Sequence, residues 1–504
     1  SLLAVAGWDG TTTSPSALTA GSAYGNNGGN ITIGGGSGNV AVGSKTGTTT
    51  LAADDLVLSA INGYAQVGYH GGGSGAIIVN ATGDVTLNGG AGTAYFAQIG
   101  DGGYQVSGSN NGTVSVLANG NVTLHAGSGQ EAYAQIGNGG AESNSNSAGY
   151  TNTGAVTVHG NAIALNAGSG NASYSQIGDG GYKSGQSLNG AATVGGDIVI
   201  AAVSGVTLTG SAADAYAQIG NGGDFINTGG ANGSSGTIGG NITVAVSSPA
   251  VAENAVVEVA GTGANSYVQI GNGGNGENTT GSGNTVTFNI SGNITVNDLT
   301  LTGSNTGSDG YAQVGNGDGA HSGTGNVAGN IAISQGTVFD LTPGTASGTS
   351  TGIQNATGTG SVSGTVSGYT ATNTAPTSDP TTAGSVSTII QNNTTPTSFT
   401  YTATSTTPIS GPSSDFTAGG SVSSAPTPLE KLAGEAEDED TPSDGVANSV
   451  GNSLNGNGKS RTVSKTIIPG VLDEIMTLTP THPHGVPPAD EDYSSWGNEA
   501  LWRW

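Results

Sequence analysis

The sequence predicts an all-β fold: a parallel β-helix (β-solenoid) with about three short strands per coil, and an irregular C-terminal region rich in Ser, Thr and Pro. A phrase of five residues, aromatic-small-Gln-Ile/Val-Gly, recurs seven times between residues 64 and 315. Two further segments of each repeat alternate apolar and polar residues, which is the pattern of a strand. The 94 glycines among 504 residues supply the tight turns that such short strands need.

The first two strands of each repeat are predicted from apolar residues spaced two apart. The pairs of the first strand are Ile77/Val79, Val114/Val116, Val156/Val158, Ile198/Ile200, Ile242/Val244 and Ile294/Val296. The pairs of the second strand are Val85/Leu87, Val122/Leu124, Ile163/Leu165, Val206/Leu208, Val257/Val259 and Leu299/Leu301. Because side chains alternate across a strand, each pair is expected to face the core.

The third strand holds the recurring phrase. Its aromatic residues are Tyr64, Phe96, Tyr133, Tyr174, Tyr216, Tyr267 and Tyr311. Its glutamines are Gln66, Gln98, Gln135, Gln176, Gln218, Gln269 and Gln313. The small residue and the Ile or Val of the phrase suit a narrow core. Alternation therefore predicts that the aromatic and Gln side chains form two outward ladders.

Two interpretations of these ladders remain open. Stacked aromatic rings and amide ladders stabilise in-register strands, and the long loop of each repeat, such as residues 141–153, would cover them. Alternatively, an exposed stripe of Tyr and Gln would bind a ligand such as a sugar ring. The second interpretation makes the ladder residues a candidate binding site.

Two competing architectures fit the repeat less well. A β-propeller also repeats every ~40 residues but needs four strands per repeat. A collagen-like chain needs Gly at every third position, which this sequence does not have.

An Asn or Asp directly follows the final Gly of the recurring phrase in six of its seven copies. These residues are Asp101, Asn138, Asp179, Asn221, Asn272 and Asn316. A calcium ligand tends to need the carboxylate charge, whereas a left-handed turn residue accepts either type. The exchange between Asn and Asp therefore favours a turn, and we expect no metal and no cofactor. His482 and His484 lie in a Pro-rich stretch without further ligands.

The charge balance argues against nucleic acid as a partner. The chain has 7 Lys and Arg against 33 Asp and Glu, and its net charge is −26. Phosphate binding depends on Lys and Arg, and an anionic membrane surface would be repelled. The chain has no Cys, so disulfides are not expected. No run approaches the ~20 apolar residues of a transmembrane helix, and any signal peptide is expected to have been removed.

Residues that would form an active site are not evident. A glycosidase needs paired carboxylates, and Asp214 and Asp224 flank one third strand without counterparts on neighbouring coils. Lyase chemistry on an acidic sugar generally needs cationic groups, and residues 1–340 contain only Lys45 and Lys183. We therefore expect no enzyme; a β-helix polysaccharide-active enzyme is the alternative of another class.

Four regions are predicted along the chain. Residues 1–62 form a cap and partial coils, 63–340 the repetitive solenoid, 341–429 a linker or stalk, and 430–504 an acidic run and an aromatic C-terminal segment. An open solenoid end is prone to aggregation unless it is capped. The candidate assembly or docking residues of the last segment are Tyr493, Trp496, Trp502 and Trp504.

Segments such as Gly-Asn-Val-Thr-Leu-His-Ala-Gly-Ser-Gly at residues 120–129 and Gly-Asn-Ile-Thr-Val at residues 292–296 resemble filamentous-haemagglutinin-like exoproteins of two-partner secretion. The resemblance covers residues 25–340. It implies a right-handed β-helix in a secreted or cell-surface bacterial adhesin, exported through an outer-membrane partner. We expect a structural or adhesive surface or biofilm-matrix protein that self-associates or binds a glycan or surface ligand. The alternative is a subunit of a self-assembling extracellular filament.

Overall fold

The computed structural model describes residues 1–7, 28–224, 235–247, 256–259, 261–275, 287–297, 299–302, 310–317, 325–334, 338–339, 341–342, 350–355, 362–363, 366–367, 370–371, 387–391, 453–454, 460–466 and 475–480. The chain forms two compact units, one of residues 1–429 with 467–475 and one of residues 430–466 with 476–504. In the described part of the chain, every regular element is a strand.

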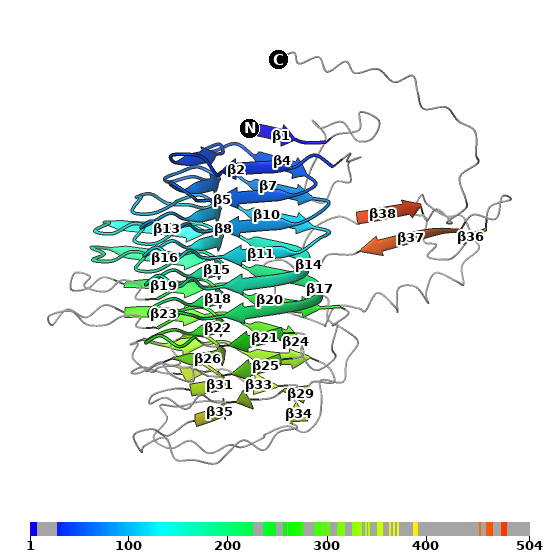
Figure 1. The fold of residues 1–504 in the computed structure, drawn as a ribbon. Coiled ribbons are helices and arrows are strands. Elements are labelled where there is room, and N and C mark those ends of the chain that lie inside the picture. Colours follow the sequence, from blue (N-terminus) through cyan, green and yellow to red (C-terminus); the bar gives the residue numbers. More distant parts are fainter. Residues whose placement is uncertain are drawn as a thin grey trace, which may run out of the picture. The chain divides into compact units, whose positions relative to one another are not determined.

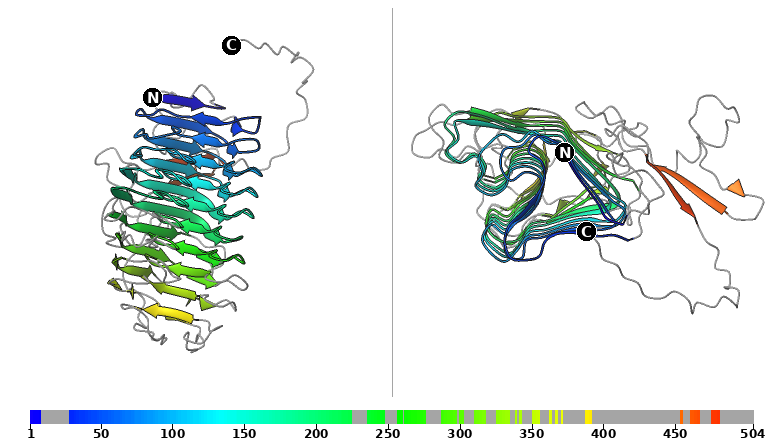
Figure 2. Two further views of the ribbon diagram at one scale, coloured as in Figure 1. Left: turned by 90° about the vertical axis from the view of Figure 1, so that its left-hand side faces the viewer. Right: turned by 90° about the horizontal axis from the view of Figure 1, so that it is seen from above.

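The first unit is a stack of coils whose strands pair in parallel, which confirms the predicted parallel β-solenoid (Figure 1). Seen along the stack, the coils enclose a three-sided core (Figure 2). The hand of the coil stays a prediction.

Three ladders of strands form the sides of the core. The first consists of β1 (Leu2–Val5), β4 (Thr49–Ala53), β7 (Ile77–Ala81), β10 (Val114–Ala118), the first half of β14 (Val156–Asn166) and of β17 (Ile198–Thr209), β20 (Ile242–Val246), β24 (Ile294–Asn297), β28 (Ile331–Ser334) and β33 (Val366–Ser367). The second consists of β2 (Ile31–Gly34), β5 (Leu56–Ser59), β8 (Val85–Asn88), β11 (Val122–His125), the second halves of β14 and β17, β21 (Val256–Val259), β25 (Leu299–Thr302) and β30 (Leu341–Thr342). The third consists of β3 (Val40–Val42), β6 (Ala65–Val67), β9 (Ala97–Ile99), β12 (Ala134–Ile136), β15 (Ser175–Ile177), β18 (Ala217–Ile219), β22 (Val268–Ile270), β26 (Tyr311–Val314), β31 (Ser350–Gln354) and β35 (Ser387–Gln391).

The core is filled by the apolar pairs that the alternation predicts. Val122 pairs with Ile163 across two coils, Leu124 pairs with Leu165, and all four side chains are buried. Ile136 of the third ladder belongs to the same buried cluster. In-register stacking thus places one apolar residue above another along each side, so that burial and backbone ladders reinforce each other.

One predicted pair is out of register by one residue. Val206 pairs with Val256 rather than Val257, and Leu208 pairs with Glu258 rather than Val259. Val256 is fully buried. Val256, Val257 and Val259 are all apolar, so the sequence pattern alone does not show which of them face the core. Only the pairing with neighbouring coils decides this.

A fourth ladder was not predicted. It consists of β13 (Gly149–Thr153), β16 (Ala191–Gly195), β19 (Ser235–Gly239), β23 (Thr287–Ser291), β27 (Val327–Ala328) and β32 (Val362–Ser363). These strands lie at the end of the variable insertion, which was expected to be a loop. The insertion encloses a second apolar cluster that includes Tyr150, Leu188, Val194 and Ile238. It is therefore a packed layer and not a simple projection.

The stack includes coils on both sides of residues 63–340. β1 pairs with β4 near the N-terminus, and β31 and β35 continue the third ladder to Gln391. These outer coils keep inward residues such as Ile353, which is buried, but lack the aromatic phrase that marks the repeat. Two strands of two residues each, β29 (Val338–Phe339) and β34 (Thr370–Ala371), pair in parallel in the same region.

The second unit contains a three-stranded sheet of β36 (Ser453–Leu454), β37 (Ser460–Thr466) and β38 (Ile475–Pro480), in which β36 and β37 are antiparallel. Across the residues that the structure describes, no helix has the length and apolarity needed to cross a membrane.

One glycine of the recurring phrase shows why it is required. Gly137 has a φ of 141°, and a Cβ atom on it would lie 2.1 Å from the carbonyl oxygen of Gly178 on the next coil. Gly100 and Gly178 occupy the same place on other coils. Any side chain here would push neighbouring coils apart.

Candidate interaction surfaces

The aromatic residues of the third ladder form one continuous stack. Neighbouring rings from Tyr64 to Tyr311 lie nearly parallel, with centroids 4.6 to 4.9 Å apart. Tyr64 is half-buried, whereas Phe96, Tyr133, Tyr174, Tyr216, Tyr267 and Tyr311 are completely buried. Of the two interpretations left open, the exposed stripe therefore does not hold for six of the seven rings. The reason is the insertion layer, since Ala141 and Tyr182 pack against the stack.

The glutamine ladder is buried as well, from Gln66 to Gln313. From Gln98 to Gln269, each Gln side chain bonds to the next coil in two ways. The Gln135 amide nitrogen donates to the carbonyl oxygens of Gly178 (3.0 Å) and Gly180 (3.2 Å). Its oxygen accepts a hydrogen bond from the Tyr174 hydroxyl (3.1 Å). The Tyr and Gln ladders thus hold coils together, as the structural interpretation predicted.

Gln98, Gln176, Gln218 and Gln269 accept the hydroxyl of the following tyrosine in the same way. The exceptions are Gln66 and Gln313, whose side-chain oxygens are buried without a hydrogen-bond partner. Gln66 faces Phe96, which has no hydroxyl, and the strand after Gln313 begins with Ser350 in place of a ring. The unpaired oxygens mark the two places where the Tyr–Gln pairing stops.

Phe96→Tyr is therefore expected to raise the free energy of unfolding by about 1 kcal/mol, because a hydroxyl would satisfy the Gln66 oxygen. The His70 ring stacks on the Tyr64 ring with their centroids 4.5 Å apart, and it lies beside Phe96. On the next coil, Gly102 occupies the position of His70. The substitution should thus be compared alone and with His70→Gly by denaturant unfolding. A loss of stability in both backgrounds would contradict the pairing.

The Asn and Asp residues after the third strand form another internal ladder. The backbone N–H of each donates to the side-chain oxygen on the next coil, from Asp101 to Asn138 (3.0 Å) and from Asn138 to Asp179 (2.7 Å). The ladder continues through Asn221, Asn272 and Asn316 to Asn355. None of these residues has a positive φ, whereas the following Gly102, Gly139 and Gly180 do. The predicted left-handed turn is therefore at the glycine, one position later.

The amide of each Asn in this ladder has a second bond across the coil. The Nδ2 groups of Asn138 and Asn221 donate to the carbonyl oxygens of Gly112 and Gly196, both at 2.8 Å. Asp179 has no such donor, and its Oδ2 accepts from the backbone N–H of Gly154 (2.9 Å) instead. Asp101 Oδ2 has no hydrogen-bond partner. The two carboxyls thus occupy the position that Asn fills on the neighbouring coils.

Burial dominates the electrostatics of these two carboxyls. Burial raises the pKa of Asp179 to about 8, although the backbone hydrogen bonds from Asn138 and Gly154 lower it. Burial raises the pKa of Asp101 to about 6, although the backbone hydrogen bond from Tyr69 lowers it. Burial disfavours the charged form of a carboxyl, so both keep their proton to a higher pH than a carboxyl in water does, and Asp179 does so up to about pH 8. A neutral carboxyl resembles the Asn of the neighbouring coils.

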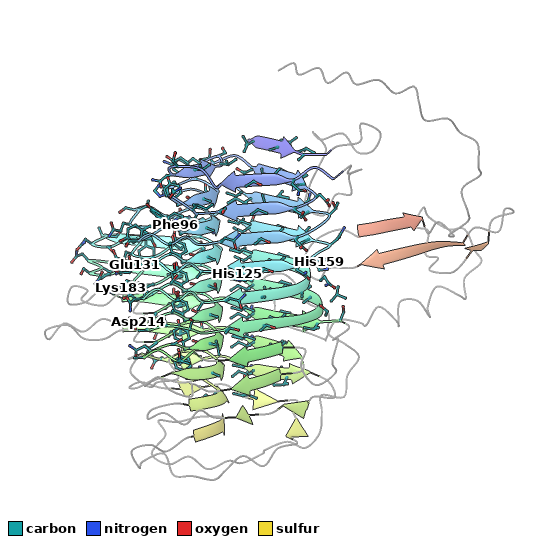
Figure 3. The ribbon with its side chains drawn as sticks, in the orientation of Figure 1. Phe96, His125, Glu131, His159, Lys183 and Asp214 are labelled. Carbon is teal, nitrogen blue, oxygen red and sulfur yellow. The ribbon has the colours of Figure 1, made fainter. Side chains whose placement is uncertain are left out.

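Charged side chains gather along one edge of the stack, where Glu131 is buried and Lys183 and Asp214 are half-exposed. Figure 3 shows Glu131, Lys183 and Asp214 above one another there, with His125 and His159 apart from them. The Tyr104 hydroxyl interacts with Glu131 and Glu142, and Lys183 lies 4.8 Å from the ring centroid of Tyr182. In the described part of the chain, no group of three or more His, Asp or Glu is arranged to hold a metal ion.

The pair Asp214 and Asp224, considered for catalysis, has two different environments. Asp214 is accessible and accepts hydrogen bonds from the side chains of Asn171 and Asn265, each at 3.0 Å. Asp224 is completely buried. His482, His484, Tyr493, Trp496, Trp502 and Trp504 lie outside the described residues.

A surface that the sequence analysis did not single out lies on the second ladder. Its outward side chains, here called the open face, are Val57, Ser59, Thr86, Asn88, Thr123, His125, Ala164, Asn166, Thr207 and Thr209. All are half-exposed or exposed, and none carries a carboxylate, an ammonium or a guanidinium group. The period-two alternation of the second strand of each repeat places these positions on its outward side.

Comparisons of the chain with protein-family models, with curated proteins and with solved structures give no match.

Proposed function

We propose that this chain is a secreted structural or adhesive protein of a bacterial surface or biofilm matrix, acting through the shape and repeated surface of its solenoid. The observation that supports this proposal is that many polar side chains of the stack point toward neighbouring coils. Three sets of side chains, the Tyr, Gln and Asn/Asp ladders, bond from coil to coil inside the stack. Such a stack provides a stiff, repetitive scaffold without disulfides.

The proposal is tested in the organism that encodes the chain. Immunogold labelling and protease treatment of intact cells are expected to find the protein outside the cell, and deletion of its gene should reduce surface attachment and biofilm mass. Complementation with the intact gene serves as the control. A protein confined to the cell interior, with unchanged attachment on deletion, would refute the proposal.

An extracellular filament is the second candidate, supported by the N-terminal edge of the stack. The edge strands β1, β2 and β3 contain no charged residue and no Pro, and Leu2 and Leu3 are 36% and 41% exposed. Edge strands normally carry charges or Pro that block pairing with another chain. Negative-stain electron microscopy over a concentration series should show regular filaments that are lost on deletion of residues 461–504. Short rods at every concentration favour the adhesive role.

A further inference from the structure

The outer surfaces of the three ladders differ in how far they are covered. The third ladder is covered by the insertion layer, which buries its Tyr and Gln side chains. The first ladder is covered in part, since its outward residues Asn80, Leu117 and Thr243 are buried whereas Ile78, Ser115 and Thr157 are half-exposed. The open face of the second ladder is the exception, because each of its outward side chains from Val57 to Thr209 reaches the surface. It is thus the side of the described coils most accessible to a large ligand.

The open face presents hydroxyl and amide groups in columns. One column holds Val57, Thr86, Thr123, Ala164 and Thr207, and the other holds Ser59, Asn88, His125, Asn166 and Thr209. Seven of these ten side chains carry a hydroxyl or an amide group. Successive coils are ~4.8 Å apart, and residues two apart along a strand are separated by ~7 Å. Five coils therefore give a flat grid about 20 Å long. Asn166 Nδ2 lies 3.3 Å from His125 Nδ1, which ties two rungs of the grid together.

We infer that the open face binds a neutral polysaccharide. The inference takes its extracellular setting from the proposed function, while the geometry stands by itself. Hydroxyl and amide groups both donate and accept hydrogen bonds, as sugar hydroxyls do. A grid that repeats along the coil axis can engage a polymer that repeats along its own axis, so that weak contacts at each coil add up to useful avidity.

Charge favours this ligand over the other partners that a flat β-sheet face can take. The chain carries a net charge of −26, so a nucleic acid or an anionic lipid surface would be repelled as it approaches. The grid has no Lys or Arg to offset that repulsion. It also has no Trp, Tyr or Arg of the kind that anchors protein interfaces. A neutral polymer approaches the face without this electrostatic cost.

Affinity electrophoresis of the full chain tests the inference. Native gels contain dextran, mixed-linkage β-glucan, mannan or galactan, and gels with alginate or no polysaccharide are run beside them. The intact chain should be retarded by at least one neutral polymer. The triple variant Thr86→Glu, Thr123→Glu and Thr207→Glu should lose this retardation at least tenfold in apparent affinity, because it places three carboxylates on the grid.

The matched control is the triple variant Thr151→Glu, Thr193→Glu and Thr237→Glu. It adds the same charge at surface threonines that are in register with one another on the fourth ladder. Retardation that survives in this control and disappears in the open-face variant supports the inference. Equal loss in both variants, no retardation by any neutral polymer, or retardation by alginate alone would overturn it.

Self-association is measured on the same samples by sedimentation velocity. A dimer of the intact chain that the open-face variant abolishes, without any retardation by polysaccharide, would assign the face to a second copy and overturn the inference. A chain that lies on the cell surface but is not retarded contradicts this inference alone. A chain that is retarded but stays inside the cell contradicts the proposed function alone.

Discussion

Asp179→Asn is expected to stabilise the solenoid by several kcal/mol at pH 8 and above, and by little at pH 4. The folded chain raises the pKa of Asp179 from 3.8 to about 8 because the carboxyl is buried. The folded state therefore holds more protons than the unfolded state between these values, and stability falls as the pH rises from about 4 through about 8. At 1.36 kcal/mol per pKa unit, the loss is on the order of 5 kcal/mol.

The Asn side chain fits the pattern of the neighbouring coils, where Asn138 and Asn221 donate to glycine carbonyl oxygens. The measurement is denaturant unfolding of the native chain and the variant at pH 4, 6 and 8. Asp84→Asn is the control, because Asp84 accepts the backbone N–H of Asn121 in an exposed ladder. It should change stability by about 0.5 kcal/mol or less at each pH. A variant that is no more stable than the native chain at pH 8 would show that burial does not hold Asp179 neutral.

Tyr174→Ala is expected to lower the free energy of unfolding by about 3–5 kcal/mol, as for other buried aromatic residues. The substitution removes a ring stacked at 4.8 Å on both Tyr133 and Tyr216, and it leaves the Gln135 oxygen without its donor. Because coils contact only their neighbours, the damage should be local. Hydrogen exchange should therefore accelerate most in β12, β15 and β18, with less change in distant coils.

Tyr174→Phe separates the two contributions. It keeps the stacking but leaves the Gln135 oxygen unpaired, as Phe96 already leaves Gln66, so a loss of about 1–2 kcal/mol is expected. Tyr69→Ala is the control outside the stack, since Tyr69 is 36% exposed, and its effect should be smaller than that of either Tyr174 variant. If Tyr69→Ala proved as damaging as Tyr174→Ala, the stack would not be the element that joins the coils.

The sequence by itself determined the class of fold and the inward residues of each coil. Strict alternation in segments such as Val122–Leu124, repeated at similar intervals, leaves few alternatives to stacked parallel strands. It also identified the Tyr and Gln ladders as outward from the central core, and this holds, because Tyr133 belongs to a cluster separate from that of Ile136. Local periodicity is sufficient here since each coil repeats the same environment.

Only the tertiary structure decided what covers that outward side. The insertion after Gly140 varies in length and has no fixed phrase, so its packing over Tyr133 and Tyr174 depends on contacts between residues of different coils. The same is true of the role of Asp179, whose partners Asn138 and Gly154 are 41 and 25 residues away. Burial and pairing between coils depend on residues that are far apart in the sequence. The alternation that reveals a strand lies within five consecutive residues.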